Sequence, residues 1–122
     1  AGCQELAGEY ETFTAPARID IAEGSASISL EPTADEELII HFTLDYAHPG
    51  IGRQSFQWIW NADSYEREIA PARTFVLHRE IEVLRGMGVG LACSAKDLLV
   101  FDDRGELIDN TLRFPDECVR HK

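Results

Sequence analysis

The sequence is short of basic residues and has no long apolar run, and both absences exclude classes of function. Its 11 Lys and Arg residues stand against 22 Asp and Glu residues, which gives a formal net charge of -11. A protein whose main role is to bind nucleic acid clusters Lys and Arg against the phosphate backbone. No apolar run approaches the roughly 20 residues that a membrane-spanning helix needs. We therefore expect neither a nucleic-acid partner nor a transmembrane segment.

Cysteine is also scarce, and its arrangement indicates a reducing compartment. Cys3, Cys93 and Cys118 are odd in number and form no C-x-x-C pair, so they do not make a disulfide framework. The cytoplasm is therefore the expected location. No signal peptide is visible and the first residue is Ala1 rather than Met, so we expect a chain that is processed or cut from a longer one.

The first half of the sequence has the period of β-strands. The 122 residues are 44% hydrophobic and 27% charged, which suits one domain with a modest core. Apolar and polar residues alternate in segments 17–22, 25–30, 37–46 and 54–60. This period of two predicts strands. The dipeptide "EG" should form a tight turn between the first two, and "HPGIG" interrupts the last two.

The second half has the longer period of helices. Segment 61–70 has Asn61 or Asp63 as a candidate cap, with Glu66 completing a capping box for Asp63. Segment 77–88 places its apolar residues on one stripe and ends at a glycine. The members of that stripe are Leu77, Ile81 and Leu84, and the candidate stops are Gly86 and Gly88.

A turn and a last helix complete the second half. The turn "DDRG" separates "LLVF" from "ELI" and predicts a hairpin, and a final helix should begin near Asp116, after Pro115. Strands followed by helices and a hairpin predict an α+β fold. In it, a small mixed sheet packs against helices on one face.

Taken alone, the chemistry-bearing residues give only a weak metal signal. His41 and His48 are interpreted as structural and His78 as solvated, because histidine is often a polar surface group. Cys118 and His121 share a helix face and could supply two zinc ligands. Zinc usually takes roughly three or four protein ligands, and no second pair is evident.

Other polar residues also have ordinary structural interpretations. A partly buried Arg73 would anchor a carboxylate. The acids at 35–37 and at 102–103 are interpreted as turn residues, because turns favour Asp. The sequence has no nucleophile elbow, phosphate loop or H-E-x-x-H motif.

Several strings in fixed order resemble one enzyme family. They are "FTLDYAHPGIG", "EIAPARTF", "REIEVLR", "DD.G.L" and "LRF.DE.VRHK", and they run from Phe42 to Lys122. Together they resemble UDP-3-O-acyl-N-acetylglucosamine deacetylase, the zinc amidohydrolase of lipid A synthesis in Gram-negative bacteria. The resemblance implies two related α+β domains with the active site between them. Residues 1–122 would be the second domain, incomplete at its C-terminal end, with an inserted β-α-β element.

The resemblance also implies a zinc site that this chain would only partly supply. His121 matches the histidine of an H-K-x-x-D step, whose aspartate would follow Lys122. The other ligand, a histidine, and the glutamate that activates the metal-bound water would come from the first domain. A further histidine, which stabilises the charge as acetate leaves, would also lie outside this chain. The expected partners are therefore Zn²⁺, the substrate and the first domain of a monomeric parent. The isolated chain should be inactive.

Substrate contacts are expected at two places. Thr74 matches a family residue that helps to hold the substrate, and Phe75 matches a residue that stacks on the sugar or acyl region of the substrate. Lys122 matches a lysine that contacts the substrate. The residues that match the lining of an apolar tunnel for the fatty-acyl chain are Ile81, Gly90, Ser94, Leu98 and Val100.

The chain also departs from the family pattern. "ACSAK" at residues 92–96 replaces the usual G-G-S-x-[DE], and Leu98 stands where Ala is common. Added Cβ atoms in place of glycine would reshape the tunnel. The alternative is therefore a divergent, non-catalytic domain that binds acyl chains or sugar nucleotides and retains the fold.

Overall fold

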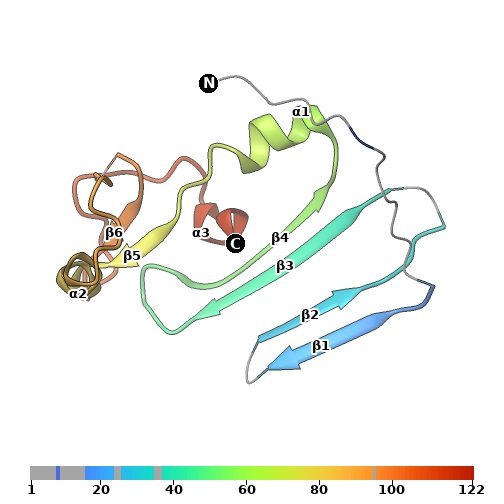
Figure 1. The fold of residues 1–122 in the computed structure, drawn as a ribbon, viewed down its shortest axis with the longest axis horizontal. Helices are drawn as coiled ribbons and strands as arrows, with labels where there is room; N and C mark the ends of the chain where they lie inside the picture. The colour runs from blue at the N-terminus through green and yellow to red at the C-terminus, as the bar shows by residue number, and fades with distance from the viewer. Residues whose placement is uncertain (1–7, 9–15, 24–25, 35–36, 95) are drawn as a thin grey trace. The chain divides into compact units, whose positions relative to one another are not determined.

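The computed structural model describes residues 8, 16–23, 26–34, 37–94 and 96–122 (Figure 1). The chain divides into two compact units, Ala1–Glu36 and Glu37–Lys122. Within the described part of the chain, no helix is long and apolar enough to cross a membrane.

The first unit contains one antiparallel ladder of two strands. Strand β1 (Ile19–Glu23) pairs with β2 (Ala26–Leu30), as the alternating pattern predicted. Beside the ladder, Arg18 Nε donates to both carboxylate oxygens of Asp20, at 3.0 and 2.9 Å. The predicted turn at "EG" and the acids at 35–37 lie partly outside the described residues.

The second unit begins with a longer antiparallel ladder. Strand β3 (Ile39–Tyr46) pairs with β4 (Gly52–Ile59). The predicted alternation is confirmed, because one face is at least partly buried along most of its length and the other is exposed. The inward face includes Phe42, Leu44, Tyr46, Phe56 and Trp58, and the outward face includes His41, Thr43, Asp45, Ser55 and Gln57.

A short helix follows β4 and closes one end of this ladder. Helix α1 (Ala62–Ser64) continues as a π-helical turn, η1 (Tyr65–Ile69). Asn61 is the cap, because its Oδ1 accepts the Ser64 N–H at 2.8 Å. The alternative cap, Asp63, lies inside the helix, so the predicted capping box with Glu66 was wrong.

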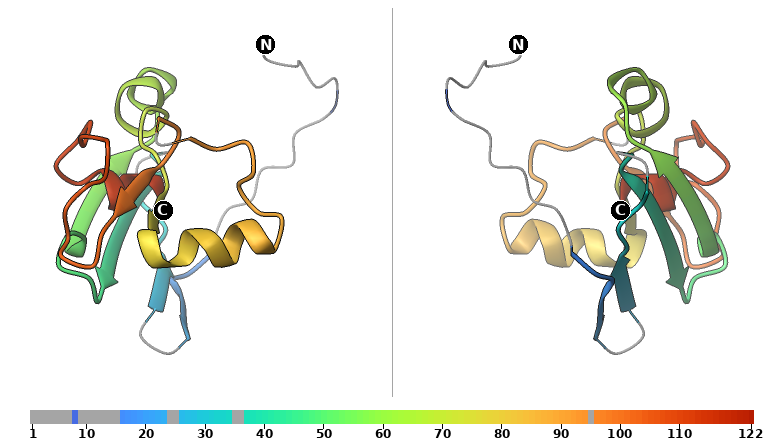
Figure 2. Two further views of the ribbon diagram at one scale, coloured as in Figure 1. Left: turned by 90° about the vertical axis from the view of Figure 1, so that its left-hand side faces the viewer. Right: turned by 90° about the vertical axis from the view of Figure 1, so that its right-hand side faces the viewer.

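The β-α-β element is present and carries α2 away from the β3–β4 ladder (Figure 2). Strands β5 (Phe75–Leu77) and β6 (Leu99–Phe101) are parallel. Between them lie a 3₁₀ turn, η2 (His78–Glu80), and helix α2 (Ile81–Gly86). A left-handed Gly88, with φ of 76°, follows α2. Leu77 was predicted on the helical stripe but belongs to β5, where it is buried in the core.

The last helix packs against the inward face of the ladder. Helix α3 (Glu117–His121) begins after Asp116, as predicted, and contacts β3, β4 and η1. The apolar core beside it contains Ile51, Leu77, Leu99, Phe101 and Cys118. The predicted hairpin is confirmed by an antiparallel bridge between Phe101 and Leu107. The α+β class is therefore confirmed, with the described strands arranged as three two-stranded ladders.

Candidate functional site

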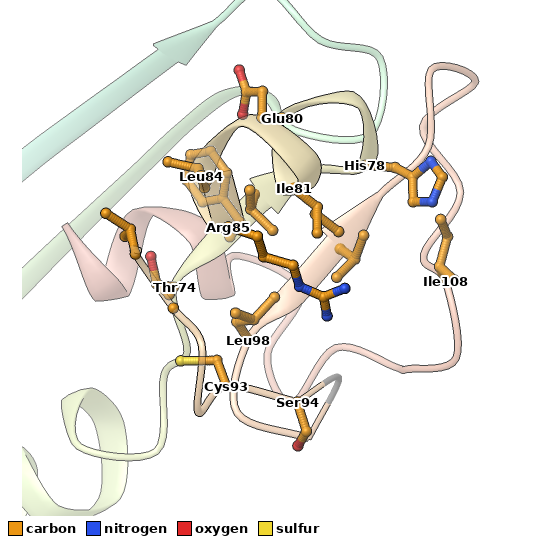
Figure 3. A pocket seen from close by; sticks show the side chains of 15 residues that line it. Thr74, His78, Glu80, Ile81, Leu84, Arg85, Cys93, Ser94, Leu98 and Ile108 are labelled. Atoms are coloured by element: carbon orange, nitrogen blue, oxygen red, sulfur yellow. The ribbon is translucent and has the colours of Figure 1, made fainter. Parts of the chain in front are cut away.

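The β-α-β element lines an open cavity of about 490 Å³ (Figure 3). Its floor and walls come from β5, α2, the segment that returns from α2, and β6. The structure brings together all the residues predicted for an acyl tunnel, together with two predicted substrate residues. Those lining residues are Thr74, Phe75, Ile81, Gly90, Ser94, Leu98 and Val100.

The cavity is mainly aliphatic, with polar groups at its ends. Cys93 and Ser94 lie together at one end, away from Glu80, and the Arg85 side chain extends from α2 toward the middle of the lining residues (Figure 3). Ser94 Oγ donates to Asp97 at 2.7 Å. The Cys93 side chain therefore occupies part of the wall where the resemblance led us to expect glycine.

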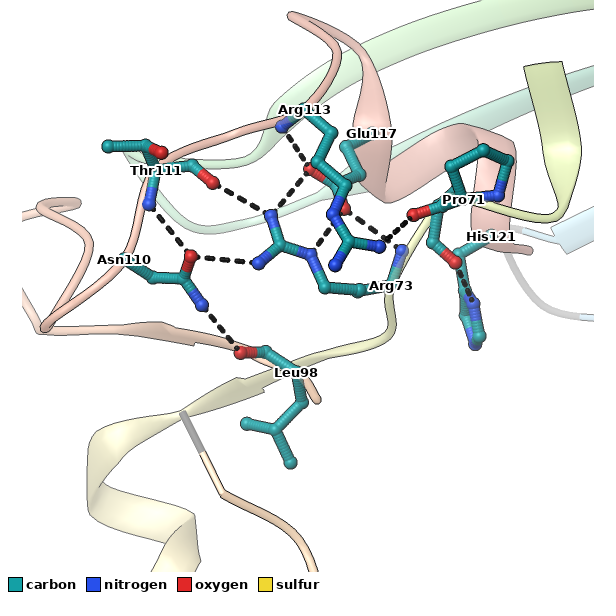
Figure 4. A network of polar contacts seen from close by, with 9 residues as sticks. Pro71, Arg73, Leu98, Asn110, Thr111, Arg113, Glu117 and His121 are labelled. Carbon is teal, nitrogen blue, oxygen red and sulfur yellow. Dashed lines mark hydrogen bonds and ion pairs between the residues drawn. The ribbon is translucent and has the colours of Figure 1, made fainter. Parts of the chain in front are cut away.

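A buried ion pair connects the segment before the cavity to the last helix (Figure 4). Arg73 Nε donates to Glu117 Oε1 at 2.8 Å, and a second guanidinium N–H donates to Oε2 at 3.1 Å. The two side chains are 8% and 0% exposed. Arg73 thus anchors a carboxylate, as predicted. Its partner was missed because the two residues lie 44 positions apart, beyond any local spacing rule.

Further contacts extend this network to the cavity wall. Arg73 also donates to Asn110 Oδ1 at 2.8 Å and to the Thr111 carbonyl at 2.7 Å. The Asn110 amide donates in turn to the Leu98 carbonyl at 3.3 Å. The backbone of Leu98, whose side chain lines the cavity, is therefore joined to the ion pair.

Hydrogen bonding keeps the Glu117 carboxylate charged despite its burial. Burial raises the pKa of Glu117, but hydrogen bonds from Arg73 and from the Arg113 backbone outweigh it, so the pKa lies below its usual value. The pKa of Arg73 is raised by its hydrogen bond to Glu117. Both groups therefore stay ionised at neutral pH.

One peptide group lies against two residues of α3. The Arg73 N–H donates to Glu117 Oε1 at 3.0 Å, and the Ala72 carbonyl contacts His121 Nδ1 at 3.2 Å. The N–H and the carbonyl belong to the same peptide group, and Glu117 and His121 lie one turn apart on the helix. Since a carbonyl oxygen can only accept, Nδ1 carries the proton in this contact, and Nε2 keeps its lone pair whenever the ring is neutral.

Comparison with known proteins identifies the family. A sequence model of UDP-3-O-acyl N-acetylglycosamine deacetylase (LpxC) matches residues 1–122. The chain belongs to this family. The UDP-3-O-acyl-N-acetylglucosamine deacetylases of Nautilia profundicola and Campylobacter lari are each 34% identical to it over the whole chain. That of Anaeromyxobacter dehalogenans is 36% identical, also over the whole chain.

The match covers only part of each relative. The chain spans 41% of the length of the Nautilia and Campylobacter proteins and 39% of the Anaeromyxobacter protein. What these deacetylases do as whole proteins is therefore assigned to this chain only as a proposal.

In this member of the family, the remaining predicted substrate residue lies beside the cavity. Lys122 Nζ is 5.0 Å from the centroid of the Phe75 ring. That ring meets Tyr46 edge to face, with centroids 5.2 Å apart. A cation and an aromatic face, together with Thr74, are thus grouped at the start of β5 and the end of α3.

Cys118 and His121 do not form the metal pair that their spacing allowed. Cys118 is 1% exposed in the apolar core, where burial raises the pKa of its thiol to about 11. His121 is exposed. Among the described residues, no three His, Cys, Asp or Glu side chains are grouped so that they could hold a metal ion.

The ring of His121 makes one contact of a kind that metal-ligating histidines often make. Ligating histidines commonly donate their other ring N–H to a carbonyl or carboxylate, which orients the ring. The contact with Ala72 has this form. The donor set present here therefore fits one ligand of a metal site and no more.

Arg120 holds the last helix in place and was missed by sequence analysis. Its guanidinium lies 4.0 Å from the Phe56 ring centroid and 4.5 Å from that of Phe114. Its Nε also donates to Asp116 at 2.6 Å. Cation–π contacts with these two rings join α3 to β4 and to the loop before the helix.

Proposed function

We propose that this chain is part of a zinc-dependent deacetylase that removes acetate from UDP-3-O-acyl-N-acetylglucosamine in lipid A biosynthesis. Membership of the family supports the reaction class. The observation that carries the role of this piece is the cavity. Residues expected to bind the acyl chain and the substrate line one apolar space, next to Lys122.

The cavity would hold the fatty-acyl chain of the substrate. Each methylene group moved from water into an apolar site contributes about 0.8 kcal/mol. Ile81, Leu98 and Val100 supply aliphatic surface for it. Phe75 and Lys122, at the β5 end, would contact the part of the substrate nearer the reacting amide.

The metal ligand from this chain would be His121, through Nε2. When bound, zinc would act as a Lewis acid at the amide carbonyl and lower the pKa of a bound water. The remaining ligands and the general base would come from parts of the parent protein outside these residues. This chain would orient the His121 imidazole through the hydrogen bond between Nδ1 and the Ala72 carbonyl. We place the parent in the cytoplasm, as a monomer.

Acetate release by the intact parent protein tests this proposal. Zinc-loaded protein should deacetylate UDP-3-O-acyl-N-acetylglucosamine much faster than UDP-N-acetylglucosamine, which has no acyl chain to fill the cavity. Leu98→Trp should raise KM for the acylated substrate only, because the larger ring fills the cavity. Leu112→Ala, at a residue outside the cavity lining, is the matched control.

Two outcomes distinguish the alternatives. An intact parent that binds the acylated sugar nucleotide without releasing acetate would be the non-catalytic binding protein that the altered "ACSAK" segment also allows. Deacetylation by residues 1–122 alone with added zinc would contradict the proposal that the general base lies outside these residues.

A further inference from the structure

The backbone of residues 71–73 is held by one short stretch of the chain. Arg113 donates from its guanidinium to the Pro71 carbonyl at 2.7 Å, and its backbone N–H donates to Glu117 Oε2 at 2.6 Å. Glu117 accepts the Arg73 N–H, and His121 contacts the Ala72 carbonyl. Figure 4 shows these contacts coming from both ends of α3 and from the loop before it.

We propose that Glu117 is a positioning residue that aims His121 by fixing the peptide group between Ala72 and Arg73. The inference rests on the proposed role of His121 as a metal ligand. The Glu117 carboxylate holds the N–H end of that peptide group, and one helical turn later the carbonyl end meets the imidazole. The Ala72 carbonyl thereby selects the tautomer with a proton on Nδ1.

Glu117 suits this role because its carboxylate is buried and hydrogen-bonded on both oxygens. It is fully buried and accepts four N–H groups, three from Arg73 and one from Arg113. A carboxylate fixed in this way has one orientation relative to both the helix and the 71–73 segment. Without it, the peptide group can rotate, the Ala72 carbonyl leaves Nδ1, and the ring can take either tautomer.

The chain itself offers a matched control. Asp116, the neighbour of Glu117, also pairs with an arginine, since it accepts from Arg120 Nε at 2.6 Å. Within the described part of the chain, the hydrogen bonds of the Ala72–Arg73 peptide group go to Glu117 and His121, not to Asp116. An asparagine Oδ1 can still accept from Arg120 Nε. Asp116→Asn therefore removes a carboxylate charge at the start of the same helix while leaving both the Arg120 contact and the peptide group in place.

The test is a comparison of the His121 tautomer in the metal-free, intact parent protein. The ¹⁵N chemical shifts of histidine ring nitrogens, measured at one fixed pH, distinguish protonation at Nδ1 from protonation at Nε2. The signals that disappear in His121→Gln are those of His121. The wild type and Asp116→Asn should both show the Nδ1–H form. Glu117→Gln should show a mixture, and its zinc affinity should fall by about 10- to 100-fold.

A folded Glu117→Gln protein with the wild-type tautomer and zinc affinity would overturn the inference. Should that variant fail to fold, Glu117→Asp serves instead, because it keeps the buried charge beside Arg73 but draws the carboxylate back from the Arg73 N–H by one methylene group. A shift toward the mixture is expected there, and an unchanged tautomer would overturn the inference.

Zinc binding by His121→Gln separates this inference from the proposed function. Unchanged zinc affinity in that variant would remove His121 from the metal site and overturn the proposed function. The tautomer measurement contains no metal, so it still reports whether Glu117 positions the ring.

Discussion

Arg73 and Glu117, 44 positions apart in the sequence, form a buried ion pair with Nε and Oε1 separated by 2.8 Å. The pair joins the segment that enters β5 to the helix that carries His121. Because β5 also forms one wall of the cavity, this contact connects the proposed acyl site to the proposed metal ligand.

Loss of one member of the pair should destabilise the protein strongly. Arg73→Ala leaves the Glu117 carboxylate buried and uncompensated, which costs about 3–5 kcal/mol. Urea denaturation measures the free energy of unfolding. Arg79→Ala is the control, because its pair with Asp103 is exposed and contributes about 1 kcal/mol or less. An equal loss of unfolding free energy in the two variants would show that the buried pair stabilises the protein no more than the exposed pair does.

Stability should depend on pH through Glu117. Its folded-state pKa lies below the usual value of about 4.3, so its contribution is complete above that pH. The contribution is lost as pH falls through the lower folded-state pKa. Unfolding free energies measured from pH 6 down to pH 2 should therefore fall more steeply in the wild type than in Glu117→Gln. Parallel curves would mean that Glu117 does not contribute through its charge.

Two glycines should respond oppositely to substitution by alanine. Gly105 has φ of 92°, and a Cβ there would lie 2.6 Å from the backbone nitrogen of Gly50. Gly105→Ala should cost about 1–3 kcal/mol or more. A Cβ on Gly86, at the end of α2, meets nothing within 4 Å, so Gly86→Ala should stabilise by about 0.5–1 kcal/mol. Thermal unfolding of both variants checks this. A stable Gly105→Ala protein would contradict the close approach of the two turns.

The two described cysteines should differ in reactivity, and an acyl ligand should change only one of them. Cys93 is exposed at the cavity, whereas Cys118 is buried with its pKa raised to about 11. In a Cys3→Ser background at pH 8, iodoacetamide should modify Cys93 at least about 100-fold faster.

Occupation of the cavity should then protect Cys93. UDP-3-O-acyl-N-acetylglucosamine should slow its alkylation, and UDP-N-acetylglucosamine, which lacks the acyl chain, should not. Mass spectrometry of the modified peptides follows both sites. Equal protection by the two ligands would place the acyl chain elsewhere.

Local patterns predicted much of the fold. Alternation in residues 37–46 and 54–60 gave the ladder and its two faces, because a period of two is a direct property of a strand. The start of α3 just after Asp116 was predicted from Pro115, and the hairpin around "DDRG" was predicted from its turn residues. Leu77 was misplaced because a three-residue strand runs directly into a helical turn, which leaves no boundary signal.

Residue spacing alone predicted less of the site. The spacing of Cys118 and His121 suggested a pair of metal ligands, but Cys118 is buried in the apolar core and His121 is exposed. Glu117 and Ala72 were missed, because their roles arise only when distant segments meet. The cavity residues were named through resemblance to a family, since nothing in the period of residues 81–100 indicates an acyl chain.

The central claim is that His121 is a ligand of a catalytic zinc in the parent deacetylase. Zinc content and acetate release, measured together on the intact parent with His121→Gln and with His41→Gln, test it most directly. His41 is exposed on the outward face of β3, so its variant should keep both zinc and turnover. The account predicts that His121→Gln loses bound zinc and acetate release together. A His121→Gln protein that retains zinc and deacetylates UDP-3-O-acyl-N-acetylglucosamine at the wild-type rate would contradict it.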